Sequence, residues 1–159
     1  MKLKRIGTLA ALDKTIVFNN IGHILNIEML QEIYQEQDGR KAIGIDGVTK
    51  EKYGDNLEEK LKAVLLKIRK GTYKPQAARM VEIPKEDGGT RPLAISCFED
   101  KLIQSAVSKI LCTIFEPIFL PSSFGYRPEL DSHEALRALN QHTYRNQDGA
   151  VVEIDIHLH

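Results

Sequence analysis

The amino-acid sequence predicts an α+β fold in which helices accompany a single β-hairpin. Apolar residues recur at helical spacing in several segments, and two short β-rich runs flank a glycine-containing turn. The length of 159 residues and an apolar content of 42% are sufficient for one modest core. The predicted order is two helical segments, a hairpin, two more helical segments and a final strand.

Two helical patterns precede the predicted hairpin. Isoleucines, a leucine and a tyrosine recur at helical spacing over residues 24–34, and Gly39 ends this pattern. The Asp-Gly pair within residues 44–47 marks a turn. Residues 57–70 then carry an apolar face with lysines opposite, and Gly71 occupies a C-cap position. We therefore expect a second, amphipathic helix that ends at Gly71.

A hairpin is predicted from residues 79–83 and 91–95, which are two short β-rich runs. Asp87, Gly88 and Gly89 supply turn residues between them. Pro84 and Pro92 restrict the two strands to edge or end positions, because proline cannot donate a backbone hydrogen bond to a neighbouring strand.

The strongest helical pattern covers residues 98–115, where a wide apolar stripe runs as far as Pro117. A loop over residues 121–128 follows, and Asp131 or Ser132 caps another short helix. The turn at Asn146–Gly149 leads into residues 150–156, whose β-branched content predicts a strand. A strand without a partner leaves backbone groups unpaired, so we expect the sequence to be truncated there.

Charge is unevenly distributed, although the 22 basic and 22 acidic residues balance overall. Residues 60–91 hold nine basic and three acidic residues, a net charge of +6. Residues 1–59 have a net charge of −2 and residues 92–159 a net charge of −4. A basic middle segment can bind a polyanion locally. The alternative is an ordinary solvated lysine face.

Several side chains are candidates for chemistry on phosphates. Asp155 follows an apolar run, where a carboxylate can face a cleft and hold Mg²⁺. Lys85 and Arg91 flank the hairpin turn and could grip a triphosphate. A backbone-contacting role in nucleic-acid binding is predicted for the basic residues Lys67, Arg69, Lys70, Lys74 and Arg79. For each candidate the alternative is an exposed charge without a functional role.

The two cysteines and the lack of a long apolar run indicate the cellular compartment in which we expect the protein. Cys97 and Cys112 are isolated thiols in a sequence without a secretory signal, so we expect a cytoplasmic location. No apolar run approaches the roughly 18 residues of a membrane-spanning helix, and we expect no membrane partner.

Read in order, several blocks of this sequence closely resemble the opening motifs of group II intron reverse transcriptase/maturases. The resemblance covers residues 40–156, and its specificity lies in the order and spacing of the blocks. These blocks are Gly44-Ile-Asp-Gly-Val-Thr49, Gly71-Thr-Tyr-Lys-Pro75, Ile83-Pro-Lys-Glu-Asp-Gly-Gly-Thr-Arg-Pro-Leu-Ala-Ile95, Asp100-Lys-Leu-Ile-Gln104, Phe115-Glu-Pro-Ile-Phe119, Ser123-Phe-Gly-Tyr-Arg-Pro128 and Val152-Glu-Ile-Asp-Ile156.

The resemblance implies the fingers subdomain of a right-hand polymerase together with the first strand of its palm. Residues 1–43 would form an N-terminal helical extension, 44–149 the fingers, and 150–159 the first palm strand. The implied activity is magnesium-dependent, RNA-directed DNA synthesis, with intron RNA, template RNA, a DNA primer and deoxynucleoside triphosphates (dNTPs) as partners. The intact protein would also assist intron splicing.

Site residues carried over by position agree with the candidates above. Asp155 looks like a metal-binding aspartate, and the carbonyl of Ile156 like a second metal contact. Lys85 and Arg91 resemble the residues that hold the triphosphate of the incoming dNTP. Arg127 lies in a block that resembles part of the template path and joins the RNA-binding candidates.

The sequence also departs from the family pattern. The Tyr-x-Asp-Asp block, which supplies further catalytic carboxylates, does not occur in these 159 residues, and Leu130 replaces a basic position. We therefore expect this chain alone to be inactive, because one carboxylate cannot hold two ions. One alternative is a non-catalytic module that binds intron RNA. Another is a CRISPR-associated, retron or diversity-generating reverse transcriptase. An uncovered apolar face makes a homodimer a further hypothesis.

Overall fold

The protein is described here from a computed structural model, which defines residues 2–86, 88–145 and 148–156. The chain divides into two compact units, Met1–Pro117 and Ile118–His159. The first unit contains helices and the β-hairpin, and the second contains one helix with its flanking segments. Helices and a two-stranded antiparallel sheet together confirm the predicted α+β class.

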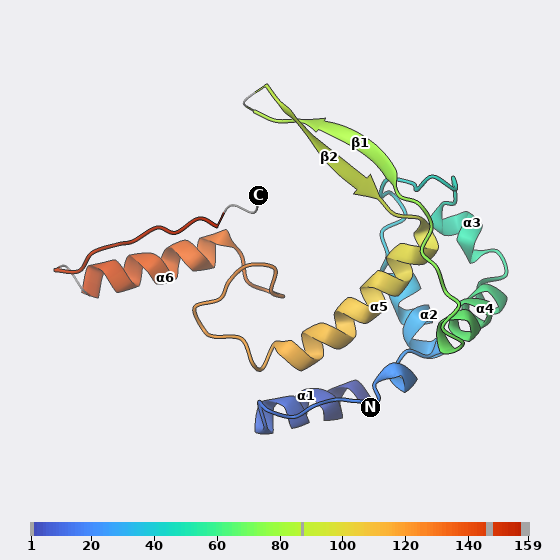
Figure 1. Cartoon of the computed structure of the whole chain (residues 1–159), viewed down its shortest axis with the longest axis horizontal. Helices are drawn as coiled ribbons and strands as arrows, with labels where there is room; N and C mark the ends of the chain where they lie inside the picture. The colour runs from blue at the N-terminus through green and yellow to red at the C-terminus, as the bar shows by residue number, and fades with distance from the viewer. Residues whose placement is uncertain (1, 87, 146–147, 157–159) are drawn as a thin grey trace. The chain divides into compact units, whose positions relative to one another are not determined.

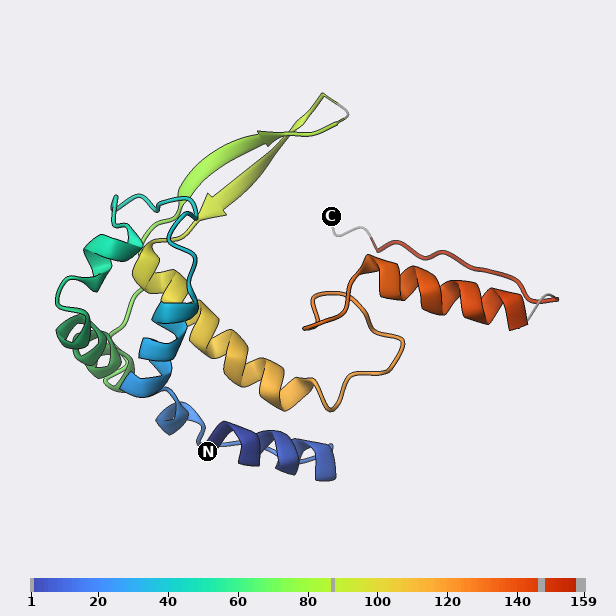
Figure 2. The ribbon, with the colours of Figure 1, turned by 180° about the vertical axis from the view of Figure 1, so that it is seen from behind.

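The core of the first unit forms around helix α5 (Phe98–Phe115). Helix α1 (Lys2–Leu12) packs on α5, as does helix α2 (Ile27–Glu36), which also contacts helix α4 (Leu57–Arg69). Figures 1 and 2 show this arrangement of helices from two opposite sides. The largest fully buried side chains come from these elements and their junctions: Leu30, Ile33, Leu61, Val64, Cys97 and Leu102.

Local hydrogen bonds explain where helix α2 and the short helix α3 begin. Asn26 caps α2, because its side-chain oxygen accepts a hydrogen bond from the Met29 N–H at 2.8 Å. The start of the predicted 24–34 pattern lies in a 3₁₀ turn (Gly22–Ile24), so the α-helix begins later than predicted. Thr49 caps helix α3 (Lys50–Gly54) in the same way as Asn26 caps α2.

Helix α4 closely matches its sequence prediction. Its buried face consists of Leu61, Val64 and Leu65, as the apolar periodicity indicated. Gly71 takes a φ of +66°, the left-handed conformation that commonly ends a helix. The prediction of a helix that stops at this glycine is confirmed.

The hairpin consists of strands β1 (Arg79–Pro84) and β2 (Thr90–Ile95), paired antiparallel. Gly88 takes a φ of +83° in the connecting turn, as the Gly-Gly pair predicted. In both views the hairpin extends away from the helices (Figures 1 and 2). Of its strand residues only Ile95, at its base, is buried.

The second unit contains helix α6 (Ser132–Arg145). Asp131 caps this helix, since its Oδ1 accepts hydrogen bonds from the N–H groups of His133 and Glu134 at 2.8 and 3.0 Å. The predicted capped helix is therefore confirmed. The predicted loop at 121–128 is confirmed as well, as a series of turns without helix or strand.

The predicted strand at residues 150–156 is not found. Residues 150–156 are extended but belong to no sheet, and the only sheet among the described residues is β1–β2. Val151, Val152 and Ile154 are 72–80% exposed, so no neighbouring strand or core covers them. A strand needs a partner for its hydrogen bonds, which β-branched composition alone does not supply. The predicted turn at 146–149 and the end of the predicted palm segment, 157–159, lie partly or wholly outside the described residues.

Within the described residues, no helix is both long enough and apolar enough to cross a membrane. Residues 1–43 and 44–117 share one core, because Ile6, Leu30 and Ile33 join the same cluster as Leu61 and Leu102.

Candidate nucleic-acid and nucleotide interface

The hairpin tip brings together the two residues predicted to hold a triphosphate. Arg91 lies opposite Ile83 in the strand register, and cross-strand partners point to the same face of a sheet. Continuing the alternation two residues past Ile83 places Lys85 on that face too. The turn is closed by the Lys85 N–H, which donates to the Gly89 carbonyl oxygen at 2.7 Å. The two cations therefore lie on one face at one end of the hairpin.

Both of these side chains are exposed. Neither forms an ion pair or a side-chain hydrogen bond with another residue in the described part of the chain. A lysine supplies a point charge and an arginine a planar fork, and each is a common ligand of phosphate oxygens. The hairpin tip is therefore chemically suited to an anion.

The base of the hairpin is fixed to the turn at residues 44–47. Arg79 Nε donates to the Ile43 carbonyl oxygen at 3.0 Å, and the Lys101 ammonium donates to the Ala42 carbonyl oxygen. Gly44 lies so close to the end of β2 that an added Cβ would meet Cys97 Cα at 2.6 Å. Arg79, predicted to bind RNA, thus already holds a backbone carbonyl.

A second group of cations gathers where α4 ends. Lys67 and Arg69 lie in the last turn of the helix and Lys70 is its C-cap. Lys74 follows in the segment that leads to β1. All four are exposed and lack a side-chain hydrogen bond or ion pair to any described residue. We call these four residues the α4-end patch. They differ from Lys62 on the same helix, which pairs with Glu58 at 2.5 Å.

The segment that carries Lys74 is held against α5 by Asp100. The Tyr73 hydroxyl donates to one carboxylate oxygen of Asp100, and the Gln76 N–H donates to the other at 3.0 Å. Asp100 is 4% exposed and is the only buried charged side chain among the described residues. These bonds satisfy a carboxylate that would otherwise be unfavourable in the core. Burial and the neighbouring Asp100 raise the pKa of Tyr73.

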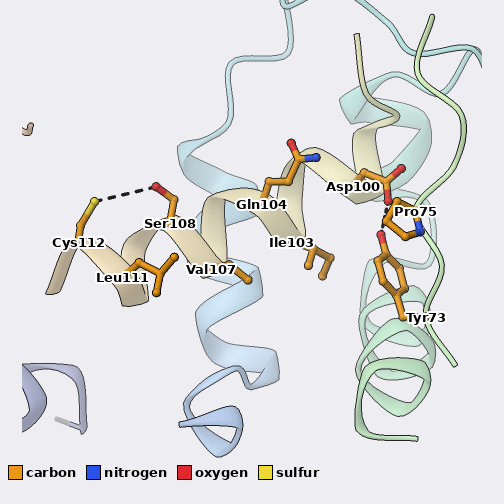
Figure 3. A pocket seen from close by; sticks show the side chains of 9 residues that line it. All are labelled: Tyr73, Pro75, Asp100, Ile103, Gln104, Val107, Ser108, Leu111 and Cys112. Carbon is orange, nitrogen blue, oxygen red and sulfur yellow. Dashed lines mark hydrogen bonds between the residues drawn. The ribbon is translucent and has the colours of Figure 1, made fainter. Parts of the chain in front are cut away.

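An apolar groove lies beside this anchor along α5. Figure 3 shows Tyr73 reaching Asp100 at one end, with Ile103, Val107 and Leu111 following along the helix. The groove has a volume of about 390 Å³. Its lining holds no basic side chain, so it is not part of the cationic surface.

Other lysines are used within the fold. Lys50 Nζ donates to the carbonyl oxygens of Gln35 and Gln37 at 3.2 and 2.6 Å, at the end of α2. Lys60 Nζ donates to the carbonyl oxygens of Lys52 and Tyr53 at 3.0 and 3.1 Å, at the end of α3. Cations favour such helix ends because the last carbonyls lack partners and carry partial negative charge.

In the second unit, Arg127 is engaged with its own loop. Its Nη1 donates to the carbonyl oxygens of Leu120 and Ser123 at 3.1 and 2.6 Å, and its guanidinium lies 5.2 Å from the centre of the Phe119 ring. Arg127 is therefore bound to carbonyl oxygens and an aromatic ring of its own loop. Its predicted contact with RNA stays a prediction.

The predicted metal ligands lie in the same unit, on the extended segment. Asp155 and Ile156 are exposed, and their carboxylate and carbonyl oxygens are donors of the kind that Mg²⁺ prefers. Among the described residues, no three His, Cys, Asp or Glu side chains are placed to hold a metal ion. The donor type fits magnesium, but two donors do not complete a site.

Sequence reasoning missed the polar contacts that organise the first unit. Asp100 was assigned no role, although an acidic residue in the first turn of a strongly apolar helix is a usable signal. Tyr53 was missed too; its hydroxyl donates to Glu99 Oε2 at 3.1 Å. Burial, together with the charge of Glu99, raises the pKa of Tyr53.

Comparison with known proteins identifies relatives of this chain by sequence. The chain matches no protein-family model. It is 35% identical over 120 residues to the group II intron-encoded protein LtrA of Lactococcus lactis, covering 75% of this chain and 20% of LtrA. It is 31% identical over 140 residues to protein YkfC of Escherichia coli, covering 86% of this chain and 37% of YkfC.

A third relative is the putative COX1/OXI3 intron 1 protein of Saccharomyces cerevisiae, 30% identical over 119 residues, which are 74% of this chain and 14% of that protein. The chain spans about a fifth of the length of LtrA and less than two-fifths of YkfC. These identities agree with the ordered motif blocks of the sequence. Over about three quarters of its own length, the chain is therefore a relative of group II intron-encoded proteins.

Proposed function

We propose that this chain forms the fingers region of a group II intron-type RNA-directed DNA polymerase. In this proposal residues 1–43 are a helical extension, 44–149 belong to the fingers, and 150–159 begin the palm. The observation that carries the proposal is the hairpin tip, where Lys85 and Arg91 share one exposed face without a partner in the described part of the chain.

The chemistry of the reaction explains why cations belong at such a tip. DNA synthesis joins a primer 3′-hydroxyl to the α-phosphate of a dNTP and releases pyrophosphate. A triphosphate and a departing pyrophosphate both carry high negative charge, which positioned cations stabilise. Lys85 and Arg91 would hold the β- and γ-phosphate oxygens of the dNTP. The narrow hairpin keeps the helices away from the nucleotide, and Arg79 fixes its base.

The template is the proposed ligand of the α4-end patch. Its four exposed cations would contact RNA phosphates, which give affinity without sequence preference. Asp100 would act indirectly, by accepting hydrogen bonds from the Tyr73 hydroxyl and the Gln76 N–H, which lie on either side of Lys74 in the sequence.

Magnesium is the proposed cofactor of the complete polymerase, with Asp155 and the Ile156 carbonyl as ligands. Mg²⁺ would neutralise phosphate charge at the reacting centre. Since these residues supply only one carboxylate, we expect no primer extension from the 159-residue chain alone. Primer extension by that purified chain would contradict this assignment.

Binding of a fluorescent dATP analogue tests the role of the hairpin tip. We expect the double variant Lys85→Ala/Arg91→Ala to bind about tenfold more weakly or worse, because charge-assisted hydrogen bonds to phosphate are lost. The matched control is Lys62→Ala, which removes a cation that is already paired with Glu58. Equal nucleotide affinity of the double variant and the control would refute the hairpin assignment.

A second candidate function is RNA binding without catalysis, in support of intron splicing. It is favoured by the α4-end patch, whose cations lie on a different element from the hairpin tip. Binding of RNA together with a complete lack of nucleotide binding would support this second function over the first.

A further inference from the structure

Two tyrosines bond to adjacent carboxylates at the start of α5. The Tyr53 hydroxyl donates to Glu99 Oε2 at 3.1 Å, and the Tyr73 hydroxyl donates to Asp100 Oδ1 (Figure 3). Tyr53 is a buried member of the core, and Tyr73 packs against that core at its margin. Tyr53 belongs to α3, whereas Tyr73 belongs to the segment between α4 and β1, which has neither helix nor strand. The second pair therefore fixes a segment that lacks regular secondary structure.

The segment between α4 and β1 is fixed at two places. At the end of α4, the N–H groups of Thr72 and Tyr73 donate to the Lys67 carbonyl oxygen at 2.9 and 3.2 Å. Farther along, the Gln76 N–H donates to Asp100 Oδ2 at 3.0 Å. Tyr73 takes part at both places, through its N–H at the first and its hydroxyl at the second. Its position therefore relates the end of α4 to the start of α5.

Lys74 is the member of the α4-end patch whose place depends on these bonds. The other three cations belong to α4 or to its C-cap, so helical hydrogen bonds hold their backbone. Lys74 lies between Tyr73 and Pro75. Proline has a fixed φ and restricts the residue before it to extended conformations. The backbone of Lys74 is therefore restricted before any ligand binds, while its side chain is exposed.

We propose that Tyr73 is a positioning residue for RNA binding, which holds Lys74 next to the end of α4 through its bond to Asp100. Prior restriction of a binding group raises affinity, because less conformational entropy is lost when the ligand binds. The proposal rests on the proposed function, in which the α4-end patch contacts RNA phosphates. It gives Tyr73 a role in RNA affinity that Tyr53, although similarly bonded, does not share.

A double-mutant cycle on RNA affinity tests this role. Tyr73→Phe retains the ring and removes only the hydroxyl, and we expect the full chain to bind single-stranded oligouridylate about three- to tenfold more weakly. In a Lys74→Ala background the same substitution should have no further effect, because Tyr73 acts through Lys74. Equal losses with and without the lysine, or no loss in either background, would overturn the proposal.

Tyr53→Phe is the matched control, since it removes a tyrosine–carboxylate bond from the same turn of α5. General destabilisation should weaken RNA binding in both variants, whereas a positioning role should appear in Tyr73→Phe alone. Binding of the fluorescent dATP analogue should be unchanged in both, because the bond from Arg79 to Ile43 fixes the base of the hairpin separately. An equal loss of RNA affinity in the two variants, or an equal loss of RNA and nucleotide affinity in Tyr73→Phe, would overturn the proposal.

Hydrogen exchange of the wild type provides a test that needs no substitution and therefore does not depend on whether Tyr73→Phe folds. The Gln76 N–H should exchange slowly without RNA, because its acceptor is the buried Asp100 carboxylate. The Ala77 N–H, which donates to no described residue, should exchange fast. Equally fast exchange of the two amides would show that the segment is not held before RNA binds, and would overturn the proposal.

The outcomes separate this proposal from the proposed function. If the wild type binds RNA and Tyr73→Phe binds it equally well, the positioning role fails and the proposed function stands. If the wild-type chain binds no RNA, the proposed function fails first, and the positioning role fails with it.

Discussion

The helical base of the first unit and the cationic surface that it carries have opposite physical characters. The base is stabilised by buried apolar side chains of α2, α4 and α5, several of them completely inaccessible to solvent. The hairpin tip and the α4-end patch are exposed, and their cations make no ion pair or side-chain hydrogen bond to any described residue. Stability and ligand binding should therefore depend on different residues.

The largest effect is expected from the base. Leu102→Ala removes a side chain that is fully buried on α5, and leaves a cavity in the core. We expect the free energy of unfolding to fall by about 2–5 kcal/mol, as measured by urea denaturation followed by circular dichroism. RNA affinity of the remaining folded fraction should not change; a loss there would break the separation between base and surface.

The junction between base and hairpin should be almost as sensitive. In Gly44→Ala the new Cβ would collide with backbone atoms of Ser96 and Cys97, which cannot move aside as a flexible side chain can. We expect a loss of about 1–3 kcal/mol in unfolding free energy. The control is Gly22→Ala, where the added Cβ meets nothing within 4 Å. Equal stability of the two variants would show that the turn at 44–47 is not tightly held.

A pH dependence should arise from the buried tyrosine of the base. Burial and Glu99 raise the folded-state pKa of Tyr53, so the neutral phenol is favoured in the folded protein. The stability that the folded protein gains from this raised pKa is complete below the unfolded-state pKa of about 10, and is lost as the pH rises towards the folded-state pKa. Above about pH 10, stability should fall by up to about 1.4 kcal/mol per pH unit for this group. The unfolding free energy of Tyr53→Phe, measured as a function of pH, should decrease less steeply above about pH 10 than that of the wild type. An identical decrease in both proteins would contradict the role of Tyr53 in this pH dependence.

The smallest effect on stability is expected at the hairpin tip. Lys85→Ala/Arg91→Ala removes two exposed charges without partners among the described residues, so unfolding free energy should stay within about 0.5 kcal/mol of wild type. Thermal or urea unfolding of the variant and the wild type would measure this difference in unfolding free energy. A loss of several kcal/mol would mean that the tip contributes to the fold and would weaken its assignment as a ligand site.

The parts of the fold that follow from local chemistry were predictable. Helix α5 begins and ends at the predicted residues, because its apolar stripe is long and Pro117 follows it. The hairpin was predictable because two β-rich runs surround a Gly-Gly turn. Residues 150–156 were mispredicted, since β-branched composition indicates a strand but cannot supply the neighbouring strand that it requires.

The candidate site was predictable in composition but not in detail. The positive charge of residues 60–91 is visible in the sequence, as are Lys85 and Arg91 beside the turn. Which cations are already in use is a tertiary property: Arg79 bonds to Ile43, thirty-six residues away, and Lys101 to Ala42, fifty-nine residues away. Spacing in the sequence carries no information about such contacts.

The salt dependence of RNA binding tests most directly whether the exposed cations are the ligand-binding surface. Affinity for single-stranded RNA should fall linearly with salt on a double-logarithmic plot, and Lys67→Ala/Lys70→Ala should reduce the slope by about 0.7 for each lysine removed. Lys62→Ala, whose cation is paired with Glu58, should leave the slope unchanged. Identical slopes for all three proteins, or no salt-dependent binding by wild type, would contradict the account.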